Sequence, residues 1–225
     1  MRPLYLIFSF PIILLSAIYF LLSKSVKEGL YVSRAKLSYS ISNPDINLIN
    51  YLVAGEDHRF YNHAGFDPIA IIRAILKRFQ GIRIEGASTI EQQYVRTCTT
   101  RYEVTISRKL EEIAIASLLS LLERKDVIAY SYLNNAYYGD NLKGFANAIK
   151  NLSLENLENI KIISNEALII SLLKNPFPNT INDKWLKKLE SRALYIQRKY
   201  TKLKRNNKKL FKCGVYKPIN PIKLE

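Results

Sequence analysis

The sequence predicts a mainly α-helical domain that follows one apolar N-terminal helix. Apolar residues recur at spacings of three and four along most of the chain, which is the pattern of one helical face. The alternation of apolar and polar residues that is typical of strands is nearly absent. Residues 4–22 read LYLIFSFPIILLSAIYFLL and carry no charge. With 225 residues, the chain is long enough for one domain with a sizeable core besides this segment.

Residues 4–22 are predicted to form an uncleaved transmembrane anchor, preceded by a short tail over residues 1–3. The uncharged run has about the length needed to cross a hydrocarbon core of roughly 30 Å as a helix. A signal peptide is the alternative, but its apolar region is usually about 7 to 15 residues long and leads into a cleavage site of small residues. Residues 23–42, which are rich in Ser and Lys, are interpreted as a juxtamembrane linker.

The charges beside the anchor favour a cytoplasmic main domain, because positively charged flanks usually stay inside the cell. Four basic residues follow the anchor and one precedes it: Lys24, Lys27, Arg34 and Lys36 against Arg2.

The main domain is expected over residues 43–200, followed by a basic tail over residues 201–225. Asn43, Pro44 and Asp45 provide a helix start. Residues 110–122 are apolar almost all round, so this helix should be central and buried. Turn chemistry is strongest in residues 81–87 and 139–144. Further helices are expected at residues 69–79, where cations lie off an apolar stripe as in an amphipathic surface helix, and at 126–137, 166–174 and 185–199.

The net charge of +15 predicts an anionic partner. Beside a membrane anchor, a phospholipid surface or a phosphorylated substrate is favoured over nucleic acid. Residues 198–212 carry eight Lys or Arg and no acid, which suits anionic headgroups, although a solvated tail has the same composition. Two cysteines, Cys98 and Cys213, and two histidines offer no ligand set at metal spacing, so no metal or cofactor is expected. Spacing does not establish a disulfide between Cys98 and Cys213.

Glu56 lies at the end of an apolar stripe formed by Ile49, Leu52, Val53 and Phe60. A carboxylate on the buried face of a helix is either a candidate general base or one half of a structural ion pair. The candidate partners for an ion pair are Arg59 and Arg73. Asp57 is adjacent to Glu56 and therefore faces another direction, so the two acids do not form a carboxylate dyad.

Two later segments contain helix starts with unusual charges. In GASTIEQQ, Ser88 followed three residues later by Glu91 predicts a capping box, and a helix N-terminus is also an anion site. In SRKLEE, Arg108 and Lys109 lie where the helix dipole disfavours cations, unless an anion lies nearby. A solvated, charged helix end is the alternative for the second segment.

These segments supply carboxylates, cations and a helix N-terminus, and this inventory distinguishes two chemistries. A glycoside hydrolase must protonate a poor leaving group, so it needs an acid beside a second carboxylate. A transferase that expels a diphosphate needs cations around the leaving group and a base for the incoming hydroxyl. The surplus of Arg and Lys favours the transferase.

Five segments together resemble the motifs of the peptidoglycan glycosyltransferase domain, which is the transglycosylase module of bifunctional penicillin-binding proteins. In order and spacing they are EDHRFYNHAGFD, GASTIEQQYVR, RKLEE, KDVIAYSYLNNAYYGDNLKG and EALIISLLKNP. With one anchor and no transpeptidase region after it, the chain resembles a monofunctional biosynthetic transglycosylase. The resemblance implies a lysozyme-like fold with a large helical lobe and a small membrane-facing lobe.

The resemblance implies that the domain polymerises lipid II, with lipid II and the lipid-linked glycan chain as partners. Glu56 corresponds to the base that deprotonates the 4-hydroxyl of the acceptor sugar, which attacks the anomeric carbon of the donor with inversion. Glu112 corresponds to the second acid, near the donor diphosphate. The substrate-binding positions of the family are matched by Ser88, Gln92, Arg96, Arg108, Lys109 and Asn134.

Some positions depart from the family pattern. Arg96 replaces a usual lysine, Val104 stands where an arginine is common, and Glu91 replaces a small hydroxyl residue and adds negative charge near the proposed diphosphate site. Arg101 is a candidate substitute for the missing arginine. The alternative function is therefore a weakened family member that binds lipid II or acts as a scaffold of the cell-wall machinery.

The resemblance also implies a location on the outer, periplasmic side of the cytoplasmic membrane, contrary to the flanking charges. We follow the resemblance, because a charge bias over short flanks is a tendency and not a rule. The cytoplasmic membrane and other proteins of cell-wall synthesis are the further expected partners.

Overall fold

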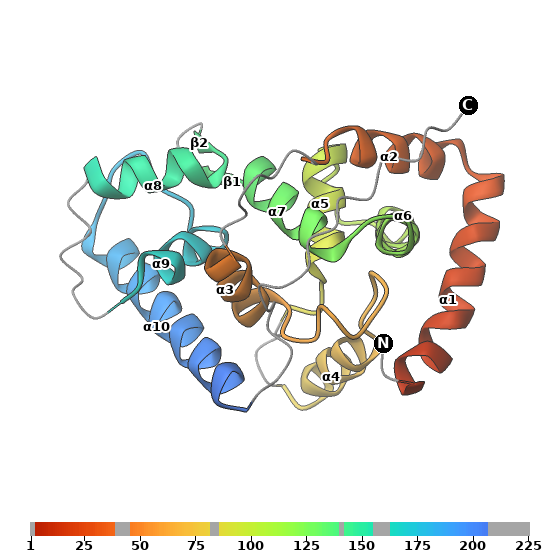
Figure 1. Cartoon of the computed structure of the whole chain (residues 1–225), viewed down its shortest axis with the longest axis horizontal. Coiled ribbons are helices and arrows are strands. Elements are labelled where there is room, and N and C mark those ends of the chain that lie inside the picture. The colour runs from red at the N-terminus through yellow and green to blue at the C-terminus, as the bar shows by residue number, and fades with distance from the viewer. Residues whose placement is uncertain (1–2, 39–45, 82–85, 140–141, 155–162, 207–225) are drawn as a thin grey trace.

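The computed structural model describes residues 3–38, 46–81, 86–139, 142–154 and 163–206, which form ten helices and one two-stranded hairpin (Figure 1). The strands, β1 (Tyr137–Gly139) and β2 (Leu142–Lys143), pair antiparallel. The mainly α class is therefore confirmed. The helices are α1 (Pro3–Leu22), α2 (Lys24–Ala35), α3 (Ile46–Glu56), α4 (Pro68–Phe79), α5 (Ile90–Thr99), α6 (Ile106–Leu122), α7 (Lys125–Asn135), α8 (Phe145–Leu154), α9 (Asn165–Leu172) and α10 (Asp183–Arg205).

The core joins helices that lie far apart in the sequence. Helix α5 packs against α2, α6 and α7, while α3 packs against α9 and α10. Figure 1 shows α2, α5 and α6 on one side of the molecule, α3, α9 and α10 on the other, and α7 between them. The stripe predicted along α3 is buried, and Phe60 beyond its end is fully buried as well. The predicted central helix is α6, which is buried at Ala114, Ala116 and Leu119 but half-exposed at its C-terminal end.

Most of the predicted linker is a packed helix, so that interpretation is wrong for residues 24–35. Ser23 caps α2 by accepting a hydrogen bond from Val26 N, and Val26 and Leu30 are buried one turn apart. Gly29 lets α2 approach α6 closely, because a Cβ at this position would lie 2.5 Å from Ile115 Cδ1. The end of the predicted linker, 39–42, and the predicted helix start at 43–45 lie outside the described residues.

Helix α1 covers the predicted anchor and lies against α6. Among the helices of the described residues, none is by itself long and apolar enough to cross a membrane. One pair, Ser9–Leu22 with Lys24–Ala35, satisfies length and composition together, and the two helices meet at an angle of 105°. The single transmembrane helix therefore stays a prediction.

Helix α4 keeps its apolar stripe out of the core. The exposed fractions of Ile69, Ile72 and Leu76 are 46%, 56% and 56%, and that of Phe79 is 86%. Asp67 caps the helix through Ala70 N, and Pro68 occupies its first position. The stripe predicted from the sequence is therefore a free apolar surface.

The last helix, α10, extends beyond its predicted bounds at both ends, whereas α9 ends two residues before its predicted end. Helix α10 runs to Arg205, so the predicted basic tail begins inside a helix, and residues 207–225, including Cys213, lie outside the described part of the chain. Helix α8 was not predicted. The loop after β2 turns at Gly144, whose φ is +81°.

Gly65 fixes the loop between α3 and α4 against α6. Its φ is +71°, and a Cβ there would lie 2.2 Å from the carbonyl oxygen of Ala116. Its own carbonyl oxygen accepts hydrogen bonds from Thr89 Oγ1 (3.0 Å) and Gln92 Nε2 (3.1 Å). A glycine is therefore needed where this loop meets the start of α5.

Candidate active site

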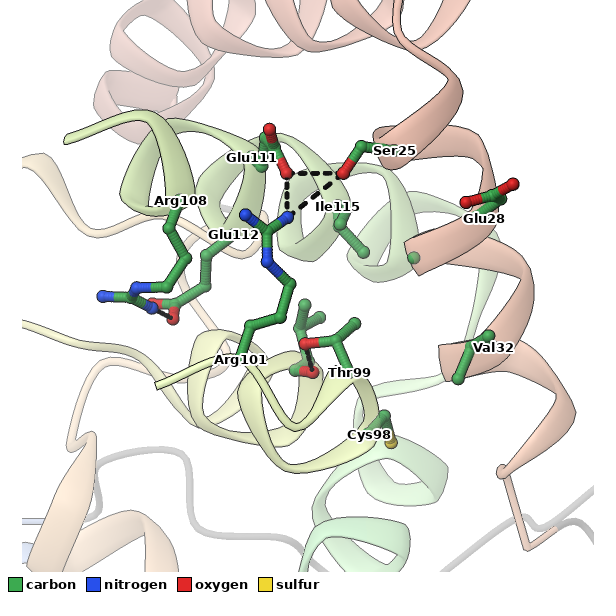
Figure 2. Close-up of a pocket in the computed structure, with 12 residues that line it drawn as sticks. Ser25, Glu28, Val32, Cys98, Thr99, Arg101, Arg108, Glu111, Glu112 and Ile115 are labelled. Carbon is green, nitrogen blue, oxygen red and sulfur yellow. Dashed lines mark hydrogen bonds and ion pairs between the residues drawn. The ribbon is translucent and has the colours of Figure 1, made fainter. Parts of the chain in front are cut away.

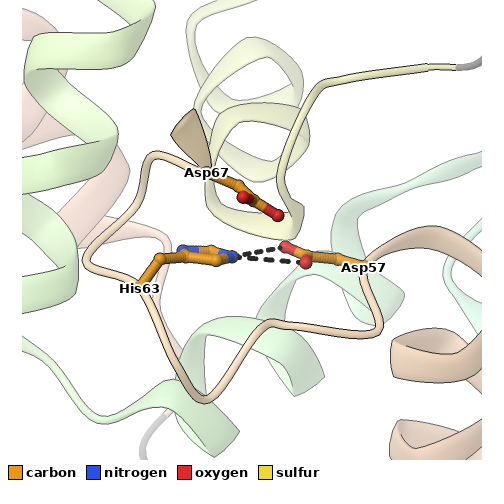
Figure 3. A group of neighbouring side chains, drawn as sticks. All are labelled: Asp57, His63 and Asp67. Carbon is orange, nitrogen blue, oxygen red and sulfur yellow. Dashed lines mark hydrogen bonds and ion pairs between the residues drawn. The ribbon is translucent and has the colours of Figure 1, made fainter. Parts of the chain in front are cut away.

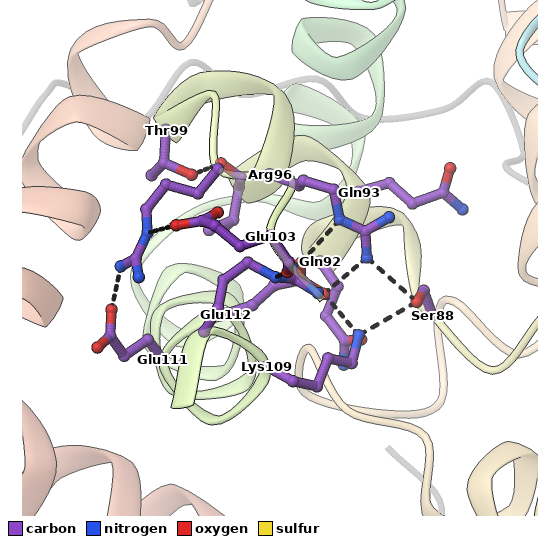
Figure 4. Close-up of polar contacts among 12 residues, drawn as sticks. Ser88, Gln92, Gln93, Arg96, Thr99, Glu103, Lys109, Glu111 and Glu112 are labelled. Atoms are coloured by element: carbon purple, nitrogen blue, oxygen red, sulfur yellow. Dashed lines mark hydrogen bonds and ion pairs between the residues drawn. The ribbon is translucent and has the colours of Figure 1, made fainter. Parts of the chain in front are cut away.

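Glu112 is surrounded by three of the predicted cations (Figure 4). Arg96 donates from Nε (2.9 Å) and Nη2 (3.0 Å) to the two carboxylate oxygens, which is a bidentate pair. Arg108 Nη1 and Lys109 Nζ each lie 2.5 Å from a carboxylate oxygen. The Glu112 side chain is only 3% exposed. The solvated helix end considered for this segment is therefore wrong, and the anion that offsets the two cations is Glu112 itself.

Ser88 and Gln92 belong to the same cluster. Lys109 Nζ donates to Ser88 Oγ (3.1 Å) and to Gln92 Oε1 (2.8 Å), and Arg96 Nη2 reaches Ser88 Oγ at 3.5 Å. The predicted capping box is wrong, because the N-cap of α5 is Thr89, which accepts from Gln92 N. Thr89 in the cap position leaves the Ser88 hydroxyl available to the cations.

The cluster holds Glu112 in its charged form. Burial alone raises the pKa of Glu112, but hydrogen bonds from Arg96 and Lys109 bring that pKa below its ordinary value. The hydrogen bond to Glu112 in turn raises the pKa of Arg96. Three cations around one carboxylate leave an excess of positive charge at this end of the site.

Glu56 ends α3 and lines a separate cleft of about 940 Å³. Its side chain is 3% exposed and accepts from Arg192 Nη2 (2.8 Å) and Gln93 Nε2 (3.2 Å), with Lys174 Nζ at 3.7 Å. The partners considered from the sequence need correction. Arg59 does not pair with Glu56 but with Asp67, at 2.7 Å. Asp67 also caps α4, the helix that follows this loop. Arg73 lines the same cleft as Glu56.

Helix α5 connects the two carboxylates. Gln93 bonds Glu56, whereas Gln92 and Arg96 belong to the Glu112 cluster. Tyr132 on α7 donates to Gln93 Oε1 at 2.7 Å. Burial raises the pKa of the Tyr132 hydroxyl well above its ordinary value, and the charge of Glu56 raises it further. Tyr132 therefore stays protonated and orients Gln93.

Asn134 is the predicted site residue that the described contacts do not bring into either cluster. It is half-buried near the end of α7, and its carbonyl oxygen lies beside Gly144. In the part of the chain that the structure describes, no side-chain hydrogen bond joins Asn134 to Glu56 or to Glu112.

Sequence reasoning missed Arg192, Gln93 and Lys174 as neighbours of Glu56. Arg192 is 136 positions away in the sequence, and it was included only in a predicted helix. Gln93 and Lys174 lie within the quoted motifs, so the motifs were the signal that could have found them. Nothing in local spacing links Arg192 to the base.

A smaller cavity of about 230 Å³ lies between α2, α5 and α6 (Figure 2). Glu111 binds Arg101 and accepts from Ser25 Oγ at 2.7 Å, which ties the turn before α6 to α2. Arg101 is therefore engaged by Glu111 and not by Glu112. Val104, at the position where arginine was expected, is 99% exposed.

Three buried side chains, Asp57, His63 and Asp67, bring possible ligand atoms within 4.8 Å of one another (Figure 3). Spacing in the sequence did not indicate this group. His63 Nε2 lies 3.0 Å from Asp57 Oδ2, which also accepts from Ile90 N, and Asp67 accepts from Arg59 and from Ala70 N. These protein partners occupy the carboxylate oxygens, so we interpret the group as a set of structural contacts that hold the loop after α3 in place.

Glu91 does not add charge to the Glu112 cluster, so that expectation is wrong. It is fully buried and forms an ion pair with Lys125, at the start of α7. The ion pair between Glu91 and Lys125 therefore connects α5 to α7, outside the group of cations around Glu112.

Comparison with known proteins agrees with this geometry. The family described as transglycosylase matches residues 26–201, so the chain belongs to this family and the resemblance to a peptidoglycan glycosyltransferase domain is confirmed. The match begins within α2, which agrees with the packing of that helix into the domain.

Three relatives indicate the range of the family. Penicillin-binding protein 1A of Rickettsia typhi is 33% identical over 171 residues, which are 74% of this chain and 21% of the relative. Penicillin-binding protein 1B of Haemophilus influenzae is 32% identical, over 63% of this chain and 19% of the relative. The monofunctional glycosyltransferase of Staphylococcus epidermidis is 31% identical, over 61% of this chain and 55% of the relative. The chain thus spans about a fifth of each penicillin-binding protein.

Proposed function

We propose that this protein is a peptidoglycan glycosyltransferase that polymerises lipid II into glycan strands. The observation that carries the proposal is the convergence of five motif residues on one buried acid. Ser88, Gln92, Arg96, Arg108 and Lys109 all lie in the cluster around Glu112. Glu56 lies apart from them, in a cleft of its own, and α5 joins the two regions.

Glu56 is the proposed general base. It removes the proton from the 4-hydroxyl of the acceptor sugar as that oxygen attacks the anomeric carbon of the donor. The new glycosidic bond forms as the bond from the anomeric carbon to the donor diphosphate breaks, and the electron pair leaves with the lipid diphosphate. Attack from the face opposite the leaving group inverts the anomeric centre. Arg192 and Gln93 orient the carboxylate of Glu56 for this step.

The Glu112 cluster is the proposed donor side. Arg96, Arg108 and Lys109 bind the diphosphate and stabilise the charge that develops on it. Glu112 keeps these cations in place before the substrate arrives. The Ser88 hydroxyl, already bonded to Lys109, can also donate to a phosphate oxygen. Asn134 is proposed to contact substrate at the end of α7.

We also infer a lysozyme-like arrangement in which α4 belongs to the smaller, membrane-facing lobe. The exposed stripe of α4 and the exposed apolar side chains of α1 support contact with the cytoplasmic membrane. The proposed location of the domain is the outer, periplasmic face of that membrane, where its partners are lipid II, the lipid-linked glycan and other proteins of cell-wall synthesis.

The test is polymerisation of labelled lipid II by the purified protein in detergent. We expect long glycan strands from the unmodified protein and a loss of at least about 100-fold for Glu56→Gln, since general bases contribute on that order. Glu123→Gln is the control, because Glu123 pairs with Arg34 at the far end of α6. The absence of polymer from the unmodified protein refutes the proposal.

The alternative is a member of the family that binds lipid II without turnover. Val104 is the observation in its favour, since its exposed apolar side chain offers no charge to a diphosphate. In that case lipid II binds to the unmodified protein but no polymer forms.

A further inference from the structure

The turn between α5 and α6 is held by polar contacts rather than by burial. Its residues 102–105 are all exposed, and the exposed fractions of Tyr102 and Val104 are 63% and 99%. Thr100, which follows α5, has a φ of +54°, a conformation that residues other than glycine rarely adopt. Because few apolar contacts fix this turn, its path depends on the side chains that bond to it.

Arg101 provides the contacts on one side of the turn (Figure 2). Its guanidinium pairs with Glu111 on α6 and donates to Ser25 Oγ on α2 at 3.1 Å. Its Nε also donates to the carboxylate of Glu103, within the turn, at 3.1 Å. One planar side chain therefore connects two helices to the turn.

Glu111 is the fixed end of these contacts. Its side chain is 11% exposed and accepts hydrogen bonds from Ser25 Oγ (2.7 Å) and Tyr19 Oη (3.4 Å) besides its pair with Arg101. Burial raises the pKa of Glu111, but hydrogen bonds from Ser25 and Arg101 bring that pKa below its ordinary value. The charged carboxylate therefore ties α1 and α2 to α6.

The same turn also holds Arg108. Arg108 Nε donates to the carbonyl oxygen of Glu103, while its Nη1 donates to Glu112 at 2.5 Å. Glu103 is common to both arginines, since Arg101 bonds its carboxylate and Arg108 bonds its carbonyl oxygen. A continuous series of contacts thus leads from Glu111, through two residues of the turn, to Arg108.

We propose that Arg101 and Glu111 are positioning residues that hold Arg108 in place for the donor diphosphate. The inference rests on the proposed function, in which Arg108 binds that diphosphate. Arg101 acts through the turn and does not itself contact the substrate, because its guanidinium is already engaged on three sides. A guanidinium binds phosphate through a planar fork, so a rotation of Arg108 weakens the contact.

Removal of the Glu111 charge distinguishes a positioning role from a direct one. If Arg101 binds the diphosphate directly, Glu111→Gln frees it and strengthens donor binding, and the loss of a negative charge acts in the same direction. If Glu111 positions Arg108 through the turn, the same substitution weakens donor binding although it makes the site more positive. The sign of the effect therefore separates the two roles.

The measurement uses a preformed lipid-linked glycan whose terminal 4-hydroxyl is blocked, so that it serves only as the donor. Addition of labelled lipid II to this glycan is followed in detergent with the full chain. We expect KM for the donor to rise about tenfold for Arg101→Ala and about threefold for Glu111→Gln. KM for lipid II should not change, whereas a general loss of structure raises both values. Thermal unfolding should change little, because partly exposed ion pairs contribute at most about 1 kcal/mol.

A double-mutant cycle identifies the residue through which Arg101 acts. Arg108→Ala should by itself raise KM for the donor, and Arg101→Ala should add less than about twofold in that background. Glu28→Gln is the matched control, because Glu28 lines the same cavity as Arg101 but is paired on the surface with Lys24 at 3.7 Å. This variant should leave both KM values unchanged.

Three outcomes overturn the assignment. A fall in the donor KM for Glu111→Gln makes Arg101 a direct ligand. Fully additive effects of Arg101→Ala and Arg108→Ala show that the two side chains act independently. An equal rise of both KM values for Arg101→Ala reduces the contacts to a general structural role.

Binding of a short-chain prenyl diphosphate, measured by calorimetry, tests the same network without turnover. We expect Kd for this probe to rise for Arg101→Ala and for Glu111→Gln in the same order as the donor KM. An unmodified protein that binds the probe but transfers no glycan refutes the proposed function alone. Unchanged Kd in both variants refutes the positioning role even if transfer by the unmodified protein is normal.

Discussion

At the scale of single residues, two glutamates of this protein, Glu112 and Glu56, have different environments. Glu112 accepts hydrogen bonds from three cations, which makes it a permanent counter-ion. Glu56 accepts from one arginine and one glutamine, has Lys174 Nζ at 3.7 Å and lines an open cleft. A carboxylate that is shared among three cations is poorly suited to take a proton, so the environments support the division of roles between base and counter-ion.

The Asp57–His63 pair makes stability depend on pH. Burial lowers the pKa of His63, but the charges of Asp57 and Glu91 and the hydrogen bond to Asp57 together raise it above its ordinary value. This contribution to stability is therefore complete below the unfolded pKa of about 6.5 and is lost as pH rises through the folded value. Burial raises the pKa of Asp57, but His63 lowers it overall, so this contribution is complete above the unfolded value of about 3.8 and is lost as pH falls through the folded value.

We therefore expect His63→Gln to lower the free energy of unfolding by roughly 3 kcal/mol near pH 5.5, and by less at pH 9. Unfolding by denaturant in detergent at several pH values measures the difference. A difference that is constant from pH 5.5 to pH 9 contradicts a charged pair.

Val104 offers a test of the donor side. Because its side chain is 99% exposed, Val104→Arg should leave stability within about 0.5 kcal/mol. We expect this variant to increase polymerisation severalfold, since a further cation near Arg108 can bind the donor diphosphate. Leu121→Arg adds the same charge at the other end of α6 and serves as the control. Equal effects of the two variants indicate net charge rather than a donor contact.

At the scale of elements, α5 organises the site because its successive residues face different partners. Gln93 turns towards Glu56, Gln92 and Arg96 turn towards Glu112, and Glu91 turns into the core towards Lys125. Adjacent helical positions are separated by about 100° of rotation, so one short motif serves three regions. The start of α5 is fixed by Thr89 as its cap and by the loop at Gly65.

Gly65→Ala tests this loop. The added Cβ meets the Ala116 carbonyl oxygen at 2.2 Å and φ is +71°, so we expect a loss of more than about 2 kcal/mol in the free energy of unfolding. Gly81→Ala is the matched control, because its φ is +66° but no atom lies within 4 Å of the added Cβ. That variant should lose only about 1 kcal/mol. Similar losses in both variants show that strain in φ, and not the contact with α6, requires glycine at position 65.

At the scale of the whole molecule, positive charge is densest on α10, whereas the exposed apolar stripes lie on α1 and α4, and α4 carries cations beside its stripe. Helix α10 carries much of the basic surface, and α1 and α4 carry exposed apolar side chains. An apolar face beside cations suits a membrane surface with anionic headgroups and a substrate that is itself an anionic lipid. Net charge predicted an anionic partner, but only the arrangement of elements separates a substrate cleft from a membrane surface.

The topology of the chain follows from the proposed function. We expect the domain to be digested when protease is added to intact spheroplasts that express the protein, because lipid II is polymerised on the outer face of the membrane. A cytoplasmic marker protein is the control for lysis. Full protection of the domain places it inside, as the basic residues after α1 favour.

Local chemistry made much of this protein readable from its sequence. The helical class followed from spacings of three and four, and Glu112 with its surrounding residues followed from motifs whose members lie within about two dozen positions. Arg108 and Lys109 share a helix with Glu112 at spacings of four and three, so local order is enough to bring these three together. Ser88, Gln92 and Arg96 join them only because α5 packs against α6.

Other features depended on contacts that are distant in the sequence. The pairing of Glu56 with Arg192, the packing of α2 against α6 and the burial of Glu91 against Lys125 arise only when separate helices meet. The sequence by itself determined the helical class, most of the helices other than α2 and α8, the family and the identity of the residues around Glu112. Only the tertiary structure decided how Glu56 is held and which apolar stripe stays exposed, because burial and long-range ion pairs depend on the neighbours that each face finds.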